Sequence, residues 1–167
     1  MWYTVFVILH IISVGFAIGL VGMAIIGTSL RKKVMGTAAE LAAIRSAATI
    51  LPIMGTIAMV GILVTGAVMT TMSYAWFPFS TLPWLAIKQT VFTIVLIVVL
   101  ASLRPRGDKI LAKATAELAG PSAMQGASAE LRALVKQQFA TTLFVGLLVL
   151  IDISLGESKA MMWLAGQ

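Results

Sequence analysis

The chain has 167 residues, of which 60% are hydrophobic and only 11% are charged, and its mean hydropathy is +1.03. Soluble domains are about half apolar and about a quarter charged, so this composition excludes an ordinary soluble domain and predicts an integral membrane protein. Cysteine is absent, which excludes disulfides, thiolate metal sites and cysteine nucleophiles. The net charge of +6 does not indicate a nucleic-acid partner, because the basic residues flank the apolar runs.

Four apolar runs follow one another along the chain. They cover about residues 3–30, 49–72, 84–103 and 138–157. A membrane-spanning helix needs about 20 such residues, so each run can cross a bilayer. Arg31, Lys32 and Lys33 follow the first run rather than precede it, which favours an uncleaved anchor over a secretory signal peptide. The sequence therefore predicts an all-α fold, a single four-helix transmembrane domain over residues 1–167.

Aromatic residues and a proline mark the ends of the runs. Aromatic rings prefer the headgroup level, which predicts an interfacial belt between the second and third runs and another contact beyond the fourth. The predicted belt residues are Tyr74, Trp76, Phe77, Phe79, Trp84 and Trp163. Pro52 is predicted to lie in the first turn of the second helix, where a missing N–H is tolerated.

The basic residues predict the orientation in the membrane. Residues 31–45 and 104–136 contain ten of the twelve Lys and Arg, leaving Lys88 and Lys159 for the other side. Cytoplasmic loops carry the excess of Lys and Arg. We therefore expect a multi-pass protein of the bacterial cytoplasmic (inner) membrane, with its N- and C-termini outside.

The segment between the third and fourth runs has the pattern of a short amphipathic cytoplasmic helix. Ile110, Leu111, Ala114 and Leu118 recur at helical spacing, and Gly120-Pro121 ends the pattern. One interpretation is a connector that lies on the membrane surface with its lysines against anionic lipid. The other is a docking site for a soluble partner.

Small residues recur in the first two runs at a spacing that allows close helix contacts. The first run has Gly15, Gly19 and Gly22, and the second has Gly55, Ala58, Gly61 and Thr65. Such faces let helices approach closely in lipid. We expect packing within the bundle, with packing against other membrane subunits or a second copy as the alternative.

Three polar residues inside the runs are the candidate functional residues. Measured from the outer end of each run, His10, Lys88 and Asp152 fall at similar depth and predict one polar layer. Histidine can ligate haem iron or another metal, lysine can hold a carboxylate, and aspartate can balance the lysine or relay a proton. The structural alternatives are a hydrogen-bonding histidine, a lysine that extends to the headgroups, and an aspartate at a helix end.

The same positions carry a family resemblance. Leu9-His10 in the first run, Arg45 with Ile50 and Pro52, and the stretch Trp84-Leu-Ala-Ile-Lys88 resemble the pattern of HemJ-type protoporphyrinogen oxidases. The layout over about residues 1–155 is also similar to CopD-like membrane domains and, most closely, to related uncharacterised integral membrane proteins. The resemblance implies a haem-containing membrane enzyme in which His10 and Lys88 are functionally important. Where HemJ proteins have an aromatic and arginine-bearing signature, this chain has Gly19-Leu-Val-Gly-Met-Ala.

Two functions remain open from the sequence. The first is a non-catalytic subunit or scaffold of a larger membrane assembly, favoured by the lack of recognisable catalytic motifs and by the glycine faces. The second is a haem-binding redox protein or HemJ-like enzyme of porphyrin metabolism, with His10, Lys88 and Asp152 as cofactor-binding residues and His10 as the iron ligand. For both functions we expect the protein to be embedded in the lipid bilayer.

Overall fold

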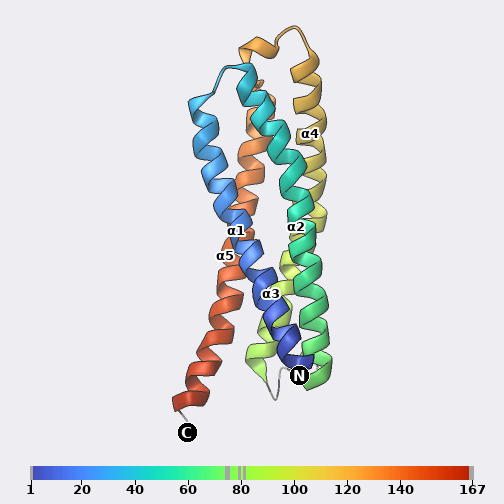
Figure 1. Cartoon of the computed structure of the whole chain (residues 1–167), viewed down its shortest axis with the longest axis vertical. Coiled ribbons are helices and arrows are strands. Elements are labelled where there is room, and N and C mark those ends of the chain that lie inside the picture. Colours follow the sequence, from blue (N-terminus) through green and yellow to red (C-terminus); the bar gives the residue numbers. More distant parts are fainter. Residues whose placement is uncertain (1, 74–75, 79, 81, 166–167) are drawn as a thin grey trace.

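The structure, a computed structural model, describes residues 2–73, 76–78, 80 and 82–165, with side chains up to Leu155 except that of Ser73. The described chain is helical apart from its short connections, which confirms the all-α prediction. Its long helices are α1 (Trp2–Lys33), α2 (Ala38–Ser73), α3 (Pro83–Val98), α4 (Arg104–Ala119) and α5 (Ala129–Ala165) (Figure 1). Four helical stretches, with α3 and α4 counted as one, are long and apolar enough to cross a membrane.

The helices form an elongated bundle with two distinct ends. The α1–α2 turn and the loop from α4 to α5 lie at one end, while both chain termini and the α2–α3 connection lie at the other (Figure 1). The first of these ends is flanked by residues 31–45 and 104–136, which contain ten of the twelve Lys and Arg. We call it the basic end.

The third helix does not stop where its apolar run stops. A π-helical turn, η1 (Val99–Leu103), joins α3 to α4 without a break. In it the N–H of Arg104 donates to the carbonyl of Val99, five residues back. The wider turn directly precedes Pro105, which lacks an N–H and would disturb a regular α-helical ladder. Gln138 of α5 donates to the Leu103 carbonyl at 3.1 Å and so supplies a hydrogen bond to this segment.

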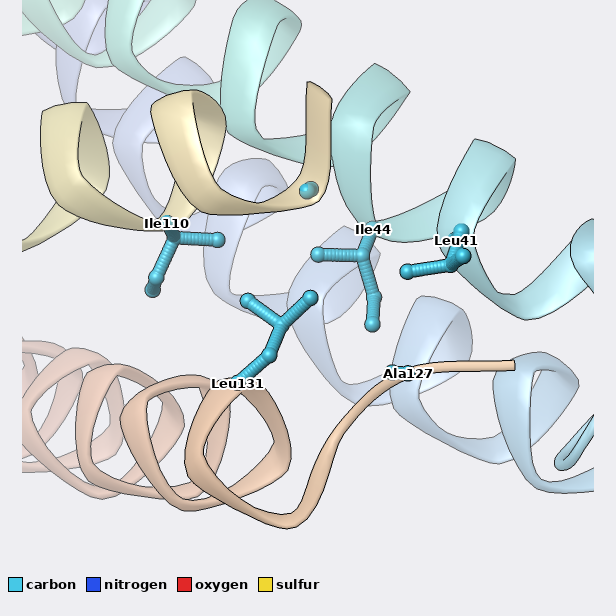
Figure 2. Close-up of a cluster of buried hydrophobic side chains, with 6 residues drawn as sticks. Leu41, Ile44, Ile110, Ala127 and Leu131 are labelled. Carbon is cyan, nitrogen blue, oxygen red and sulfur yellow. The ribbon is translucent and has the colours of Figure 1, made fainter. Parts of the chain in front are cut away.

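The helices are longer than a bilayer is thick, and at the basic end they form an extension with its own apolar core. The 36 residues of α2 measure about 54 Å, against about 30 Å of hydrocarbon. At this end α2, α4, α5 and the loop before α5 bury one cluster of apolar side chains. Its members are Leu41, Ile44, Ile110, Ala114, Ala127 and Leu131 (Figure 2). The apolar side of α4 therefore packs on α2 and α5 inside the protein.

The membrane-spanning part packs differently from this core. Many of its buried residues are small or hydroxylated, among them Ala58, Thr65, Thr70 and Ala86. Large apolar side chains such as Ile12, Ile57 and Ile97 are exposed. Small residues at helix contacts and large apolar ones outside are typical of helices packed in lipid.

The structure bears on the predicted place of Pro52 and on the predicted aromatic belt. Pro52 lies well inside α2, which begins at Ala38, so its predicted place in a first turn is wrong. Of the predicted aromatic belt, Trp76 and Phe77 are exposed at the end opposite the basic end. Tyr74, Phe79 and the side chains of Trp163 and Lys159 lie outside the described residues.

Candidate functional site: a polar layer in the bundle

The three candidate residues come from three helices of the bundle. His10 lies on α1, Lys88 on α3 and Asp152 on α5, all in the half of the bundle away from the basic end. The tertiary structure pairs Lys88 of α3 with Asp152 of α5, and it pairs His10 of α1 with a residue of α2.

Lys88 and Asp152 face each other as an ion pair. Nζ of Lys88 lies 3.8 Å from Oδ2 of Asp152, and each side chain is 23% exposed. The second carboxylate oxygen, Oδ1, is buried and accepts no hydrogen bond from the described residues. The pair neutralises two charges that would each be costly alone at this depth.

His10 is fixed by a residue that sequence reasoning did not assign to the site. Nδ1 of His10 lies 2.8 Å from Oγ1 of Thr65, a buried residue of α2. Thr65 donates its own hydroxyl proton to the carbonyl of Gly61 at 2.6 Å. Since that proton is already used, Nδ1 of His10 must be the donor to Oγ1. In the neutral ring, the lone pair is therefore on Nε2.

The imidazole lies beside Gly66 of α2. A Cβ at Gly66 would lie 3.5 Å from Cε1 of His10, which is an ordinary van der Waals contact. The only sign of the partnership in the sequence is that Thr65-Gly66 continues the small-residue face of the second run. Such faces occur in many membrane helices, so this signal alone does not identify a histidine partner.

The layer offers few groups for a metal ion or cofactor. Among the side chains that the structure describes, no three His, Asp or Glu residues come together to hold a metal ion. His10 does not line the pocket beside Arg45 or the pocket beside Arg132. The side chains described here offer one nitrogen that could bind a metal ion, Nε2 of His10. Lys88, the residue that would hold a carboxylate, is occupied by Asp152.

A second polar constellation, at the basic end, was not predicted. The Glu40 carboxylate is 1% exposed and accepts two hydrogen bonds from Arg132, at 2.9 and 2.7 Å. It also accepts from the N–H groups of Gly36, at 2.9 Å, and Ala127, at 3.3 Å. These donors hold the pKa of Glu40 at about 2, the Arg132 hydrogen bonds being the largest cause. Gly126 has φ +77° and lies so close to Glu40 and Gly36 that a Cβ would not fit.

The glycines predicted to pack inside the bundle do so on α2 but not on α1. Gly61 of α2 meets Ser13 of α1 so closely that an added Cβ would contact the hydroxyl. A Cβ added at Gly15, Gly19 or Gly22 of α1 would meet nothing within 4 Å. Packing within the bundle, expected for both faces, is therefore confirmed at Gly61 and wrong for these glycines of α1.

No family model, curated protein or solved structure matches this chain.

Proposed function

We propose that the protein is a non-catalytic subunit or scaffold of a larger membrane assembly, in which another transmembrane helix packs on α1. The observation that carries the proposal is the exposure of α1, since none of its residues is buried in the described structure. Its outward face is a stripe at helical spacing, comprising Ile8, Ile12, Gly15, Gly19, Met23 and Ile26.

The pairing inside the bundle supports a structural role. His10 is hydrogen-bonded to Thr65, and Lys88 is paired with Asp152. Both arrangements tie helices together, because each joins residues distant in the chain. The polar layer is then explained by its contribution to helix packing, and the open glycines of α1 provide the surface for the partner helix.

The test compares two equal substitutions on different helices. Gly19→Leu should shrink the complex that the protein forms in native gels while leaving the melting temperature of the isolated bundle unchanged. Gly55→Leu is the matched control, because a Cβ at Gly55 also meets nothing within 4 Å but lies on α2. Loss of the complex in both variants, or in neither, would refute the assignment to α1. Since the chain has no cysteine, Gly19→Cys would form a cross-linked dimer if the partner is a second copy.

The second candidate function is haem binding, as the HemJ resemblance implies. The observation that favours it is the hydrogen bond from Nδ1 of His10 to Thr65, which leaves the Nε2 lone pair for an iron ligand. Bound haem would supply redox chemistry, and Nε2 of His10 would hold its iron. The purified protein should then show a Soret band that His10→Ala abolishes and Thr65→Val alters. A colourless wild-type protein, purified from cells supplied with haem, would refute this candidate.

The proposal includes the orientation and location expected from the basic residues. The basic end would lie in the cytoplasm and both termini outside the bacterial inner membrane. The grouping of residues 31–45 and 104–136 near one end of the bundle supports it (Figure 1).

A further inference from the structure

A pocket of about 290 Å³ opens between α1 and α5 at the basic end. Four cationic side chains line it, those of Arg31, Lys32, Arg132 and Lys136, together with the carboxylate of Glu40. Four positive charges against one negative charge leave the pocket with a net charge of +3. A pocket with this excess of positive charge attracts an anion.

The cations of the pocket are available for a ligand. Arg31, Lys32 and Lys136 form no ion pair with any residue that the structure describes. Arg132 is held in place by Glu40, which accepts from Nε and Nη2 and leaves the two N–H bonds of Nη1 unused. Arginine positioned in this way is suited to phosphate, whose oxygens match its planar donors.

The position of the pocket identifies the source of the anion. Arg31 directly follows the first apolar run and Lys136 directly precedes the fourth, so the cations lie at the level where headgroups meet water. Phe139 lines the pocket one helical turn nearer the membrane than Lys136. A cationic opening above an apolar wall matches the structure of a phospholipid. We infer that the pocket binds the phosphate group of an anionic phospholipid, with an acyl chain against Phe139.

The test uses the purified full-length protein and native mass spectrometry. Phosphatidylglycerol and phosphatidylcholine with identical acyl chains are the two probes. The wild type should retain phosphatidylglycerol preferentially, and the double variant Arg31→Gln, Lys136→Gln should lose about tenfold or more of that preference. Neither residue takes part in the Glu40–Arg132 contacts, so the fold is retained, and a melting curve in lipid-free detergent verifies this.

A matched control separates a defined site from diffuse surface charge. The double variant Lys33→Gln, Lys109→Gln removes the same charge from the same end, but neither lysine lines the pocket. It should keep the wild-type preference, and an equal loss in this control would overturn the proposal. Displacement of phosphatidylglycerol by millimolar inorganic phosphate would also overturn it, because the site would then serve a free phosphate. A wild type without preference between the two lipids would overturn it as well.

Discussion

Arg132 and Glu40 lie 92 residues apart in the chain and join α5 to the start of α2 through two parallel hydrogen bonds of 2.9 and 2.7 Å. The carboxylate also accepts from the turn that follows α1 and from the loop that precedes α5. One buried acidic residue thereby connects the chain segments that meet at the basic end. Its contacts make the stability of this end dependent on pH.

We expect the acid sensitivity of the protein to depend on Glu40. Its pKa is lowered from 4.5 to about 2, so the stabilisation is complete above pH 4.5 and is lost as the pH falls from 4.5 towards 2. Glu40→Gln should lower the melting temperature at pH 7 by about 4 to 8 °C. In this variant the loss of stability between pH 4.5 and 2 that depends on Glu40 should be absent. Thermal unfolding in detergent at several pH values measures both effects.

The control for this prediction is Glu130→Gln, which removes an exposed carboxylate that pairs with Lys113 at the same end. It should keep the wild-type decline between pH 4.5 and 2. If Glu40→Gln shows that decline unchanged, the Arg132 pair does not govern stability in acid.

Lys88 and Asp152 should compensate each other. Each single replacement, Lys88→Met or Asp152→Leu, leaves a charge in the bundle without its partner at 3.8 Å. The double variant should be more stable than the sum of the single losses predicts, with a coupling energy of about 1 to 3 kcal/mol. Thermal unfolding of the four proteins of the cycle gives this energy.

Ser154→Ala provides the comparison, because the Ser154 hydroxyl bonds only to Leu150 of its own helix. Combined with Lys88→Met, it should behave additively. Equal coupling in both cycles would show that the ion pair has no specific effect.

The contact between α1 and α2 should tolerate no side chain at position 61. Gly61→Ala should lower the free energy of unfolding by about 1 to 3 kcal/mol, because the added Cβ meets the Ser13 hydroxyl, itself bonded to Leu9 at 2.8 Å. Ser13→Gly in the same chain should restore part of the loss. Gly55→Ala should have little effect, and an equal loss there would contradict the close approach at Ser13.

The orientation is testable with single cysteines in this cysteine-free chain. Ser80 and Ser122 are exposed at opposite ends of the bundle. On intact cells, a membrane-impermeant thiol reagent should label Ser80→Cys and should label Ser122→Cys only after the cells are opened. Labelling of Ser122→Cys from outside would reverse the proposed topology.

The number of helices and their membrane character followed from the sequence. Each apolar run is long enough to cross a bilayer, and this property depends only on residues adjacent in the chain. The run that ends at Leu103 shows where local reasoning fails. The apolar run ends at Leu103, but the helix continues past Pro105. The π-helical turn and the hydrogen bond from Gln138 of a distant helix allow this continuation.

The sequence by itself determined the four apolar helices, the polar residues within them and the grouping of basic residues, because composition and periodicity are local properties. Only the tertiary structure decided how these residues are paired. Thr65 orients His10, Glu40 holds Arg132, and Gly61 rather than Gly19 meets a neighbouring helix. These contacts depend on the rotation of each helix about its own axis. In lipid that rotation is set by close packing between helices and has no strong signature in hydropathy.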